Sequence, residues 1–449
     1  MSSNWSFKKL GDLVTFLSGG TPSKSNKDYW NGDIPWISAS SMQSTRYHDS
    51  DLRVTSLGST NGTRLVPAET VLLLVRGGAL HNKIPVGITT REVTFNQDVK
   101  ALVPKSEDIT PYYLLAWLIS SRELLLGKVE NTGIGAGKLD TKILQDLDVP
   151  VPPKAELLRL ELFSKALDDK IILNQNINQT LEQMAQALFK SWFVDFEPVK
   201  AKIAVLETGG SQEDATIAAM TAISGKDANA LAVFGREQPE QYTELKTTAE
   251  LFPNAMQDSE LGNIPVTWEM GKLQDLLVLQ RGFDLPSSAR KDGEFPLIAA
   301  SGPNGTHNVA MAKAPGVITG RSGVLGKVYL TLEDYWPLNT TLWVKEFKRA
   351  KPCYAYELLR LLDMKAFNAG SAVPSLNRNH IHSLSYPLPP QELVNLFESS
   401  ALVLHQRAHV NLKHSQSLAL LRDTLLPKLL SGEITLPEAE QAVSEAENV

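Results

Sequence analysis

Two long stretches of the chain carry apolar residues at intervals of three and four. They run from about residue 154 to 193 and from about 391 to 432, and each follows a Pro-x-Pro-Pro segment that ends a strand-like run. This spacing is typical of a long helix that packs against another helix. A helix of about 40 residues is about 60 Å long and cannot bury its apolar stripe against itself. The pattern therefore predicts two long helices that pair as an antiparallel coiled coil.

Polar residues interrupt both predicted stripes near their midpoints, with Asn174 in the first helix and Asn411 in the second. We expect the two asparagines to form a buried polar layer that fixes the register of the helices at some cost in stability. Asparagines that face solvent are the alternative. The apolar seams themselves are predicted at Leu160, Phe163, Leu167, Ile177, Leu181, Met184 and Leu188, and at Phe397, Leu404, Leu418, Leu421 and Leu425.

The sequence also contains an internal repeat, and a repeat of this kind indicates two domains with the same fold. The last block of the repeat is the sharpest, because its residues recur at a constant shift of 237 positions. Earlier blocks have larger shifts, which indicates shorter loops in the second copy. The matching pairs are Trp5 and Trp268, Leu10 and Leu273, Gly19 and Gly282, Pro35 and Pro296, Arg76 and Arg321, Asn96 and Asn339, Leu139 and Leu376, and Pro153 and Pro390.

Each copy begins with short strand-like runs, such as Val71 to Val75, among Gly and Pro turns and occasional helices, such as Tyr112 to Ser120. This mixture predicts an α+β fold class, with two strand-rich domains separated by the two long helices. The predicted segments are a first domain at 1–153, the first long helix at 154–196, an acidic insert or linker at 197–262, a second domain at 263–390, the second long helix at 391–432 and a tail at 433–449.

Composition narrows the class of protein. Hydrophobic residues make up 43% of the 449 residues and charged residues 21%, as in a globular protein. No apolar run approaches the roughly 20 residues of a membrane-spanning helix, and the polar N-terminus lacks the apolar core of a secretory signal. Cys353 is the only cysteine, which excludes a disulfide framework. We therefore expect a cytoplasmic protein with no membrane partner.

The net charge of −6 argues at first against nucleic acid. The acidity lies in the segments 196–262 and 391–449, however, whereas the two predicted domains are neutral to basic. A positive face on each domain is compatible with an acidic molecule.

Candidate catalytic motifs are weak. No Asn/Asp-Pro-Pro-aromatic motif of an amino-methyltransferase is present. The stretch Gly133 to Lys138 has the wrong spacing for a phosphate-binding loop and is followed by Leu139 instead of Ser or Thr. His380 and His382 have no nearby carboxylate or cysteine to complete a metal site. We therefore predict no catalytic residues and no metal.

Several duplicated motifs resemble the specificity subunits of type I restriction-modification systems, the HsdS family. They are Ser18 to Ser23, Gly32 to Ile37, Phe95 to Asp98, the Pro-x-Pro-Pro helix starts, Leu188 to Phe196 and Leu426 to Ile434. They cover nearly the whole chain in order. Family members often carry Glu-Gln a few residues after the prolines, whereas this chain has Lys154 and Gln391 directly after them and Glu156 and Glu392 further on.

The resemblance implies two target-recognition domains, each reading one half of a split, asymmetric site in double-stranded DNA, with the helices setting the gap. It also implies two modification subunits that carry S-adenosylmethionine for adenine methylation, and restriction subunits that use ATP for translocation and cleavage. The chain itself would bind no cofactor and would not be an enzyme. A rigid spacer between two readers makes the half-site separation a geometric constant.

Candidate DNA contacts are residue types that hydrogen-bond bases or phosphates. For any one of them, a solvated surface charge is the alternative, and Asn96 and Asn339 are expected to be structural. The candidates are Thr21, Ser23, Lys24, Arg76, Lys83 and Lys138 in the first domain, and Arg281, Arg290, Lys291, Arg321, Lys327 and Arg378 in the second.

Three aromatic residues, Trp192, Phe193 and Phe196, end the first helix. We expect them to form a surface for the modification subunits, since a solitary coiled coil would not expose such a patch. Packing against the recognition domains is the competing account. For the whole chain, the other hypotheses are a stand-alone DNA methyltransferase or nuclease, and a helical adaptor of a defence complex that reads no sequence.

Overall fold

The computed structural model describes residues 5–131, 135–367 and 375–447. These residues form two compact units. The first unit contains residues 1–175 and 412–449, and the second contains residues 176–411. Within the described ranges, no helix is both long enough and apolar enough to cross a bilayer.

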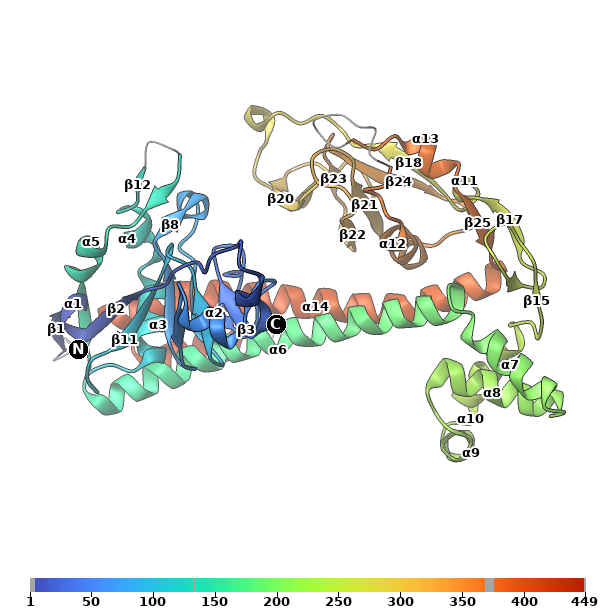
Figure 1. The fold of residues 1–449 in the computed structure, drawn as a ribbon, viewed down its shortest axis with the longest axis horizontal. Coiled ribbons are helices and arrows are strands. Elements are labelled where there is room, and N and C mark those ends of the chain that lie inside the picture. Colours follow the sequence, from blue (N-terminus) through green and yellow to red (C-terminus); the bar gives the residue numbers. More distant parts are fainter. Residues whose placement is uncertain (1–4, 132–134, 368–374, 448–449) are drawn as a thin grey trace. The chain divides into compact units, whose positions relative to one another are not determined.

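The first unit is built on two β-sheets (Figure 1). Its larger sheet has the strand order β2-β11-β7-β9-β4, and its second sheet the order β5-β3-β10-β6. The apolar run predicted as a strand forms β7 (Val71–Leu74), which is buried on both faces. The helix α3 (Pro111–Ser120) packs against β7 and β9. The other strands are β2 (Val14–Ser18), β11 (Val99–Pro104), β9 (Val86–Thr89), β4 (Arg46–Tyr47), β5 (Arg53–Val54), β3 (Trp30–Ile37), β10 (Val93–Phe95) and β6 (Arg64–Val66).

The second unit repeats this topology with fewer strands. Its sheets have the orders β18-β24-β21-β22 and β20-β19-β23, and α12 (Pro352–Leu361) takes the place of α3. In both units the strand before the long helix pairs with the strand that opens the repeat, β14 (Asp148–Val151) with β1 (Ser6–Lys9), and β25 (Ser385–Leu388) with β17 (Glu269–Lys272). The α+β duplication predicted from the sequence is confirmed. The remaining strands are β18 (Leu277–Arg281), β24 (Thr341–Phe347), β21 (Gly316–Gly320), β22 (Val328–Thr331), β20 (Gly302–His307), β19 (Phe295–Ala299) and β23 (Trp336–Pro337).

The two long helices are α6 (Lys154–Phe193) and α14 (Gln391–Ser431). In the first unit, Asp168 of α6 pairs with Arg422 of α14. In the second unit, the side chain of Asn178 donates to the carbonyl of Ala408 at 2.9 Å, and Phe189 packs edge-on against Phe397 further along. Residue numbers thus rise along α6 as they fall along α14, so the helices pair antiparallel, as predicted.

The predicted seam is wrong at two residues. Ile177 and Met184 are 36% and 51% exposed, whereas Asn174 and Ala185 are buried. An α-helix turns by about 100° per residue, which places Ile177 about 80° away from the face that carries Leu167. The seam instead passes through the asparagines, because a strict seven-residue repeat drifts around a straight helix.

The asparagines are buried, so the solvent-facing alternative is wrong. Nδ2 of Asn174 lies 3.3 Å from Nδ1 of His414 in the first unit. In the second unit, Asn411 donates to Oδ1 of Asn178 at 3.0 Å. Each asparagine therefore meets a polar residue of the opposite helix within its own unit. Their role in fixing register stays a prediction.

A buried ion cluster joins the first β-rich domain to its helices. Asp168 is 2% exposed and accepts from Nη1 of Arg422 at 2.6 Å and from Nη1 of Arg46 at 3.3 Å. Arg46 is the first residue of β4, whereas Asp168 lies on α6 and Arg422 on α14. Arg46 also contacts the exposed Asp169 at 3.2 Å. The cluster therefore fixes the orientation of β4 against both helices of this unit.

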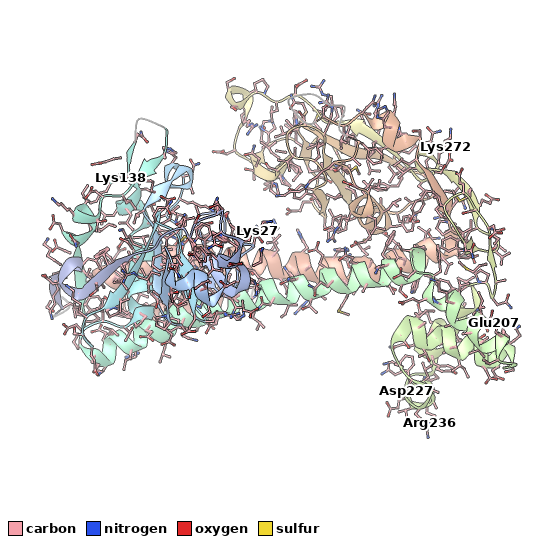
Figure 2. All side chains as sticks on the ribbon, viewed as in Figure 1. Lys27, Lys138, Glu207, Asp227, Arg236 and Lys272 are labelled. Atoms are coloured by element: carbon pink, nitrogen blue, oxygen red, sulfur yellow. The ribbon has the colours of Figure 1, made fainter. Side chains whose placement is uncertain are left out.

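The acidic insert folds as a small helical bundle in the second unit. Its core contains Ala219, Met220, Leu231 and Ala249. The amine of Lys202 is buried and donates to the carbonyl of Phe252 at 2.6 Å, which ties the bundle to the chain that follows it. The helices are α7 (Glu197–Glu207), α8 (Gln212–Ser224), α9 (Ala228–Glu237) and α10 (Pro239–Glu250); Figure 2 labels Asp227 and Arg236 at the ends of α9.

The C-terminal segment is also helical. The helix α15 (Leu436–Glu447) buries Ala439 in the core of the first unit, beside Leu160 of α6. The segment predicted as a tail thus adds a third helix to this part of the helical pair.

Replacing Asp168 with Asn should destabilise the first unit by about 3 to 5 kcal/mol, because two buried guanidinium groups lose their shared carboxylate. The matched Asp169→Asn variant should cost about 1 kcal/mol or less, since that carboxylate is exposed. Hydrogen exchange of the α6 backbone amides measures the loss locally. Equal protection in the two variants would show that the cluster does not hold the helix.

Candidate nucleic-acid interface

Arg76 and Lys138 lie opposite each other on a small three-stranded sheet, of order β12-β13-β8. The strands are β8 (Arg76–Gly77), β13 (Gly137–Lys138) and β12 (Glu130–Asn131), and Figure 2 labels Lys138 there. A Cβ at Gly137 would lie 2.8 Å from Leu80, so only glycine fits the strand at this point. Directly opposed residues place their Cβ atoms about 5 Å apart on one face. The sheet therefore brings two cations together.

The loop after β2 is linked to this small sheet by a hydrogen bond to Gln97. The hydroxyl of Thr21 donates to Oε1 of Gln97 at 2.8 Å. The next residue, Asp98, accepts from the amide of Arg76 at 3.3 Å through its carbonyl. Thr21 and Gln97 are thus linked through the backbone of Asp98 to Arg76 and Lys138, and we call these four residues the basic edge.

Gln97 was missed among the candidates, although its neighbours were noted. Its side chain is exposed, and a carboxamide can pair with adenine by donating and accepting together. Asn96 is buried and closes the turn by accepting from the amide of Asp98 at 3.1 Å. The sequence signal that could have identified Gln97 was its residue type, since glutamine is a base-reading side chain. The structure adds that Gln97 is exposed, whereas the preceding Asn96 is buried.

Lys138 carries an ion pair within the unit. Its amine lies 3.0 Å from a carboxylate oxygen of Asp140. Asp140 also accepts from the amide of Lys142, and that backbone bond, followed by the Lys138 side chain, holds the pKa of its carboxyl below the ordinary value. Because the pair is exposed, a phosphate can compete for the amine.

The remaining candidates of the first unit make other contacts or are exposed. Ser23 and Lys24 are exposed in the loop before the short helix η1 (Lys27–Tyr29), where the hydroxyl of Ser23 lies 2.8 Å from that of Ser25. Lys83 donates to Oε1 of Gln43 at 3.3 Å and lines a separate hollow.

Main-chain hydrogen bonds correct the pairing of the two repeats. In the first unit, the carbonyl of Asp98 accepts from two successive amides ending at Arg76. In the second, the carbonyl of Thr340 accepts from two successive amides ending at Ser322. Ser322, and not Arg321, therefore occupies the position of Arg76. The sequence pairing of the two arginines is wrong by one residue.

The same displacement applies to the asparagines. The amide of Asn96 donates to a carbonyl of β3 at 3.0 Å, and the amide of Leu338 donates to the equivalent carbonyl of β19 at 2.9 Å. Leu338 thus stands where Asn96 does, and Asn339 stands at the position of Gln97. Ser375 bridges Ser322 as Lys138 pairs with Arg76. The second unit has serines where the first has its two opposed cations.

Two candidate arginines of the second unit belong to one cluster. Nη1 of Arg321 donates to the carbonyl of Asn339 at 3.3 Å. The side chain of Asn339 donates to Asp284, which lies 3.4 Å from Nη2 of Arg281. Arg321 is partly buried and holds the backbone, whereas Arg281 is exposed at the end of β18. Asn339 therefore has a structural bond, as expected.

The other candidates of the second unit are not joined to this cluster. Lys291, Lys327 and Arg378 are exposed, and Arg378 begins the short helix α13 (Arg378–His382). Arg290 is partly buried, and its Nε has no hydrogen-bond partner among the described residues.

One histidine of the pair considered as metal ligands has a partner in the backbone. His382 accepts from the amide of Leu279 at 2.8 Å, and its pKa lies below the ordinary value, chiefly because of burial. Within the described ranges, no three His, Cys, Asp or Glu residues gather as a metal site. Gly133 and Ile134 of the glycine-rich stretch lie outside the described residues.

The aromatic residues at the end of α6 are not a partner surface, which corrects that expectation. Trp192, Phe193 and Phe196 are 3%, 2% and 8% exposed in the core of the second unit. Phe193 lies 4.9 Å from Tyr354 and Phe196 5.4 Å from Trp268, measured between ring centroids. Edge-on packing within the chain therefore accounts for them.

Comparisons with known proteins find relatives of this chain. The model of the type I restriction modification DNA specificity domain matches residues 2–183. The specificity subunit of the type I restriction enzyme HindI from Haemophilus influenzae is 30% identical over 366 residues, covering 74% of this chain and 79% of that protein. The MjaIX specificity subunit from Methanocaldococcus jannaschii is 23% identical, covering 97% and 94%. A type I restriction-modification S subunit from M. genitalium aligns with a TM-score of 0.47 and 13% identity over 95% and 96% of the two chains.

These matches define a DNA specificity protein. The chain belongs to the family of type I restriction enzyme specificity subunits. Its role is sequence-specific DNA recognition as a non-catalytic part of a restriction-modification system.

Replacing Arg76 with Ala should weaken binding to target DNA by about 1 to 3 kcal/mol if the guanidinium pairs with a base, and should relax selectivity at one position. The Lys138→Ala variant should weaken binding to all sequences and lower the salt dependence by about one unit if the amine contacts a phosphate. Titration at several salt concentrations separates the two effects. Exposed Lys105, at the end of β11, provides the control Lys105→Ala. Affinities equal to the control would remove both residues from the interface.

Proposed function

We propose that the chain reads a split and asymmetric DNA target, with one half-site contacted by each β-rich domain. The observation that carries this proposal is the repeated backbone with unlike side chains. At equivalent positions the first unit has Arg76 and Lys138, and the second has Ser322 and Ser375. Arginine and lysine favour guanine, whereas serine discriminates little between bases. Two domains that differ at such positions would read different half-sites.

The candidate DNA contacts remain proposals in this scheme. In the first unit, the basic edge supports Thr21, Arg76 and Lys138, with Gln97 added from the structure. In the second unit, Arg281 is exposed at the end of β18 and is the candidate for a base contact there. The other exposed cations would contact phosphates, which position a protein on DNA without reading its sequence. They are Lys24, Lys83, Lys291, Lys327 and Arg378.

The helical pair would hold two modification subunits, with restriction subunits completing the enzyme. S-adenosylmethionine and ATP would be bound by those partners. Exposed apolar side chains on the helices support this role, since such side chains mark protein contacts when they gather. On α6 they include Leu158, Leu162 and Leu173, which are 43%, 66% and 57% exposed. On α14 they are Val403, Val410, Leu412 and Leu420.

Sequencing of methylated bases in cells that carry this chain with its modification subunits tests target reading. We expect a motif of two different specific blocks separated by a fixed number of unspecified bases. A continuous motif, or methylation without sequence preference, would contradict the proposal. Methyl transfer by the purified chain alone would favour a stand-alone enzyme instead.

Replacing Leu162 with Glu tests the helical docking face. A buried interface charge should weaken copurification of the modification subunits at least tenfold, since every 1.4 kcal/mol of binding free energy is a factor of ten. Leu124 lies on α4 (Arg122–Leu126) and is 52% exposed, so Leu124→Glu is the matched control. Equal recovery of the partners with both variants would remove Leu162 from the docking face.

A further inference from the structure

A hollow of about 350 Å³ lies in the first unit, beside the helical pair. The residues around it come from the segments 42–45 and 82–86, from α4, and from the facing parts of α6 and α14. Three cations line the hollow, Lys83, Arg122 and Arg422, and none of its described lining residues is Asp or Glu. A concave surface lined by cations and no carboxylates favours an anion.

The three cations differ in how well they are already satisfied. Arg422 is 6% exposed and is bound by Asp168 at 2.6 Å and by Asp423 at 2.7 Å. Arg122 has a weaker contact, with Nη1 3.7 Å from Asp423. The Nε of Arg122 is buried and has no hydrogen-bond partner among the described residues. A buried N–H without an acceptor is costly, and among the three cations of the hollow it is the partly buried Arg122 that has one.

The ion pairs around Arg122 leave positive charge in excess. Asp168 and Asp423 are shared among Arg46, Arg122 and Arg422, so two carboxylates face three guanidinium groups. The exposed Asp169 is shared in turn between Arg46 and Lys165. Burial, followed by the charge of Arg422, lowers the pKa of Arg122. A bound anion would offset both effects.

Lys83 supplies the second available cation at the rim. Its side chain is exposed, and its amine contacts the amide oxygen of Gln43 at 3.3 Å, with no carboxylate in that bond. Asn82 and Gln175 add side-chain amide donors to the lining. A tetrahedral phosphate accepts several such donors at once, and guanidinium groups match its geometry in a bidentate manner.

We propose that this hollow binds a phosphate group held by Arg122 and Lys83. The source of this phosphate is a backbone phosphate of bound DNA. This choice of source rests on the proposed function. A free phosphate compound is the other source of the same chemistry. In either case the contact lies apart from the basic edge and would add affinity without reading bases.

Inorganic pyrophosphate is the probe for the site, with the full chain titrated by calorimetry at low salt. We expect binding that Lys83→Gln weakens about tenfold, since a charge-assisted hydrogen bond is lost. Lys83 is exposed, so this variant keeps the fold, whereas Arg122→Gln also removes a partly buried side chain that contacts Asp423. Lys154→Gln, at the first residue of α6, is the control and should bind as the unchanged chain does. No binding, or equal binding by Lys83→Gln and the control, would overturn the proposal.

DNA titrations of the chain assembled with its modification subunits distinguish the two sources. If a DNA phosphate enters the hollow, Lys83→Gln lowers the salt dependence by about one unit on target and non-target DNA alike. If only a free phosphate compound enters, pyrophosphate binding depends on Lys83 and the DNA salt dependence does not change. Failure of the proposed function would show separately, as loss of the preference of the unchanged chain for target over non-target DNA.

Discussion

The structure depends on how the apolar faces of two very long helices are buried. The helices α6 and α14 have 40 and 41 residues, and most of the stability of such helices comes from packing of their apolar faces. Each half of the pair therefore shares the core of the β-rich domain in its unit. Leu160 and Leu426 belong to the core of the first unit, and Phe189 and Phe397 to that of the second. Because helix and domain share one core, neither can rotate without exposing apolar surface.

Polar pairs fix the orientation of the domain on the helices, which apolar burial alone does not determine. Apolar contacts are non-directional, so several rotations of a domain about a helix would bury similar areas. Asp168 removes this freedom in the first unit, since its carboxylate accepts from Arg46 of β4 and Arg422 of α14. Buried ion pairs add little net stability, because desolvation offsets their attraction. Their contribution is a unique orientation, which a protein that presents a reading surface requires.

The sequence predicted the features that repeat and missed those that depend on a single residue. The duplicated α+β domains and the antiparallel helices followed from the shift of 237 residues and from apolar spacing. Matching by residue identity paired Arg76 with Arg321, because sequence similarity cannot locate a one-residue difference inside a loop. Heptad reasoning placed Ile177 in the seam, although helical geometry turns that face outward. The burial of Trp192 was one of two open alternatives, since its partners lie far along the chain, at Phe252 and Phe397, and residue type alone could not choose between a partner surface and packing within the chain.

The duplicated backbone explains how one fold can present two different surfaces. In each unit, a carbonyl of the loop between two strands, that of Asp98 between β10 and β11 or that of Thr340 between β23 and β24, accepts from two successive amides. These bonds involve no side chains, so the backbone frame holds whatever residues occupy the neighbouring positions. The position therefore holds Arg76 in the first unit and Ser322 in the second, and the main-chain pairing is the same in both. Substitution at such positions would change the hydrogen-bonding groups of the proposed DNA-contacting surface at small cost in stability, whereas substitution of Asp168 or Phe189 would disturb the core that orients the domain.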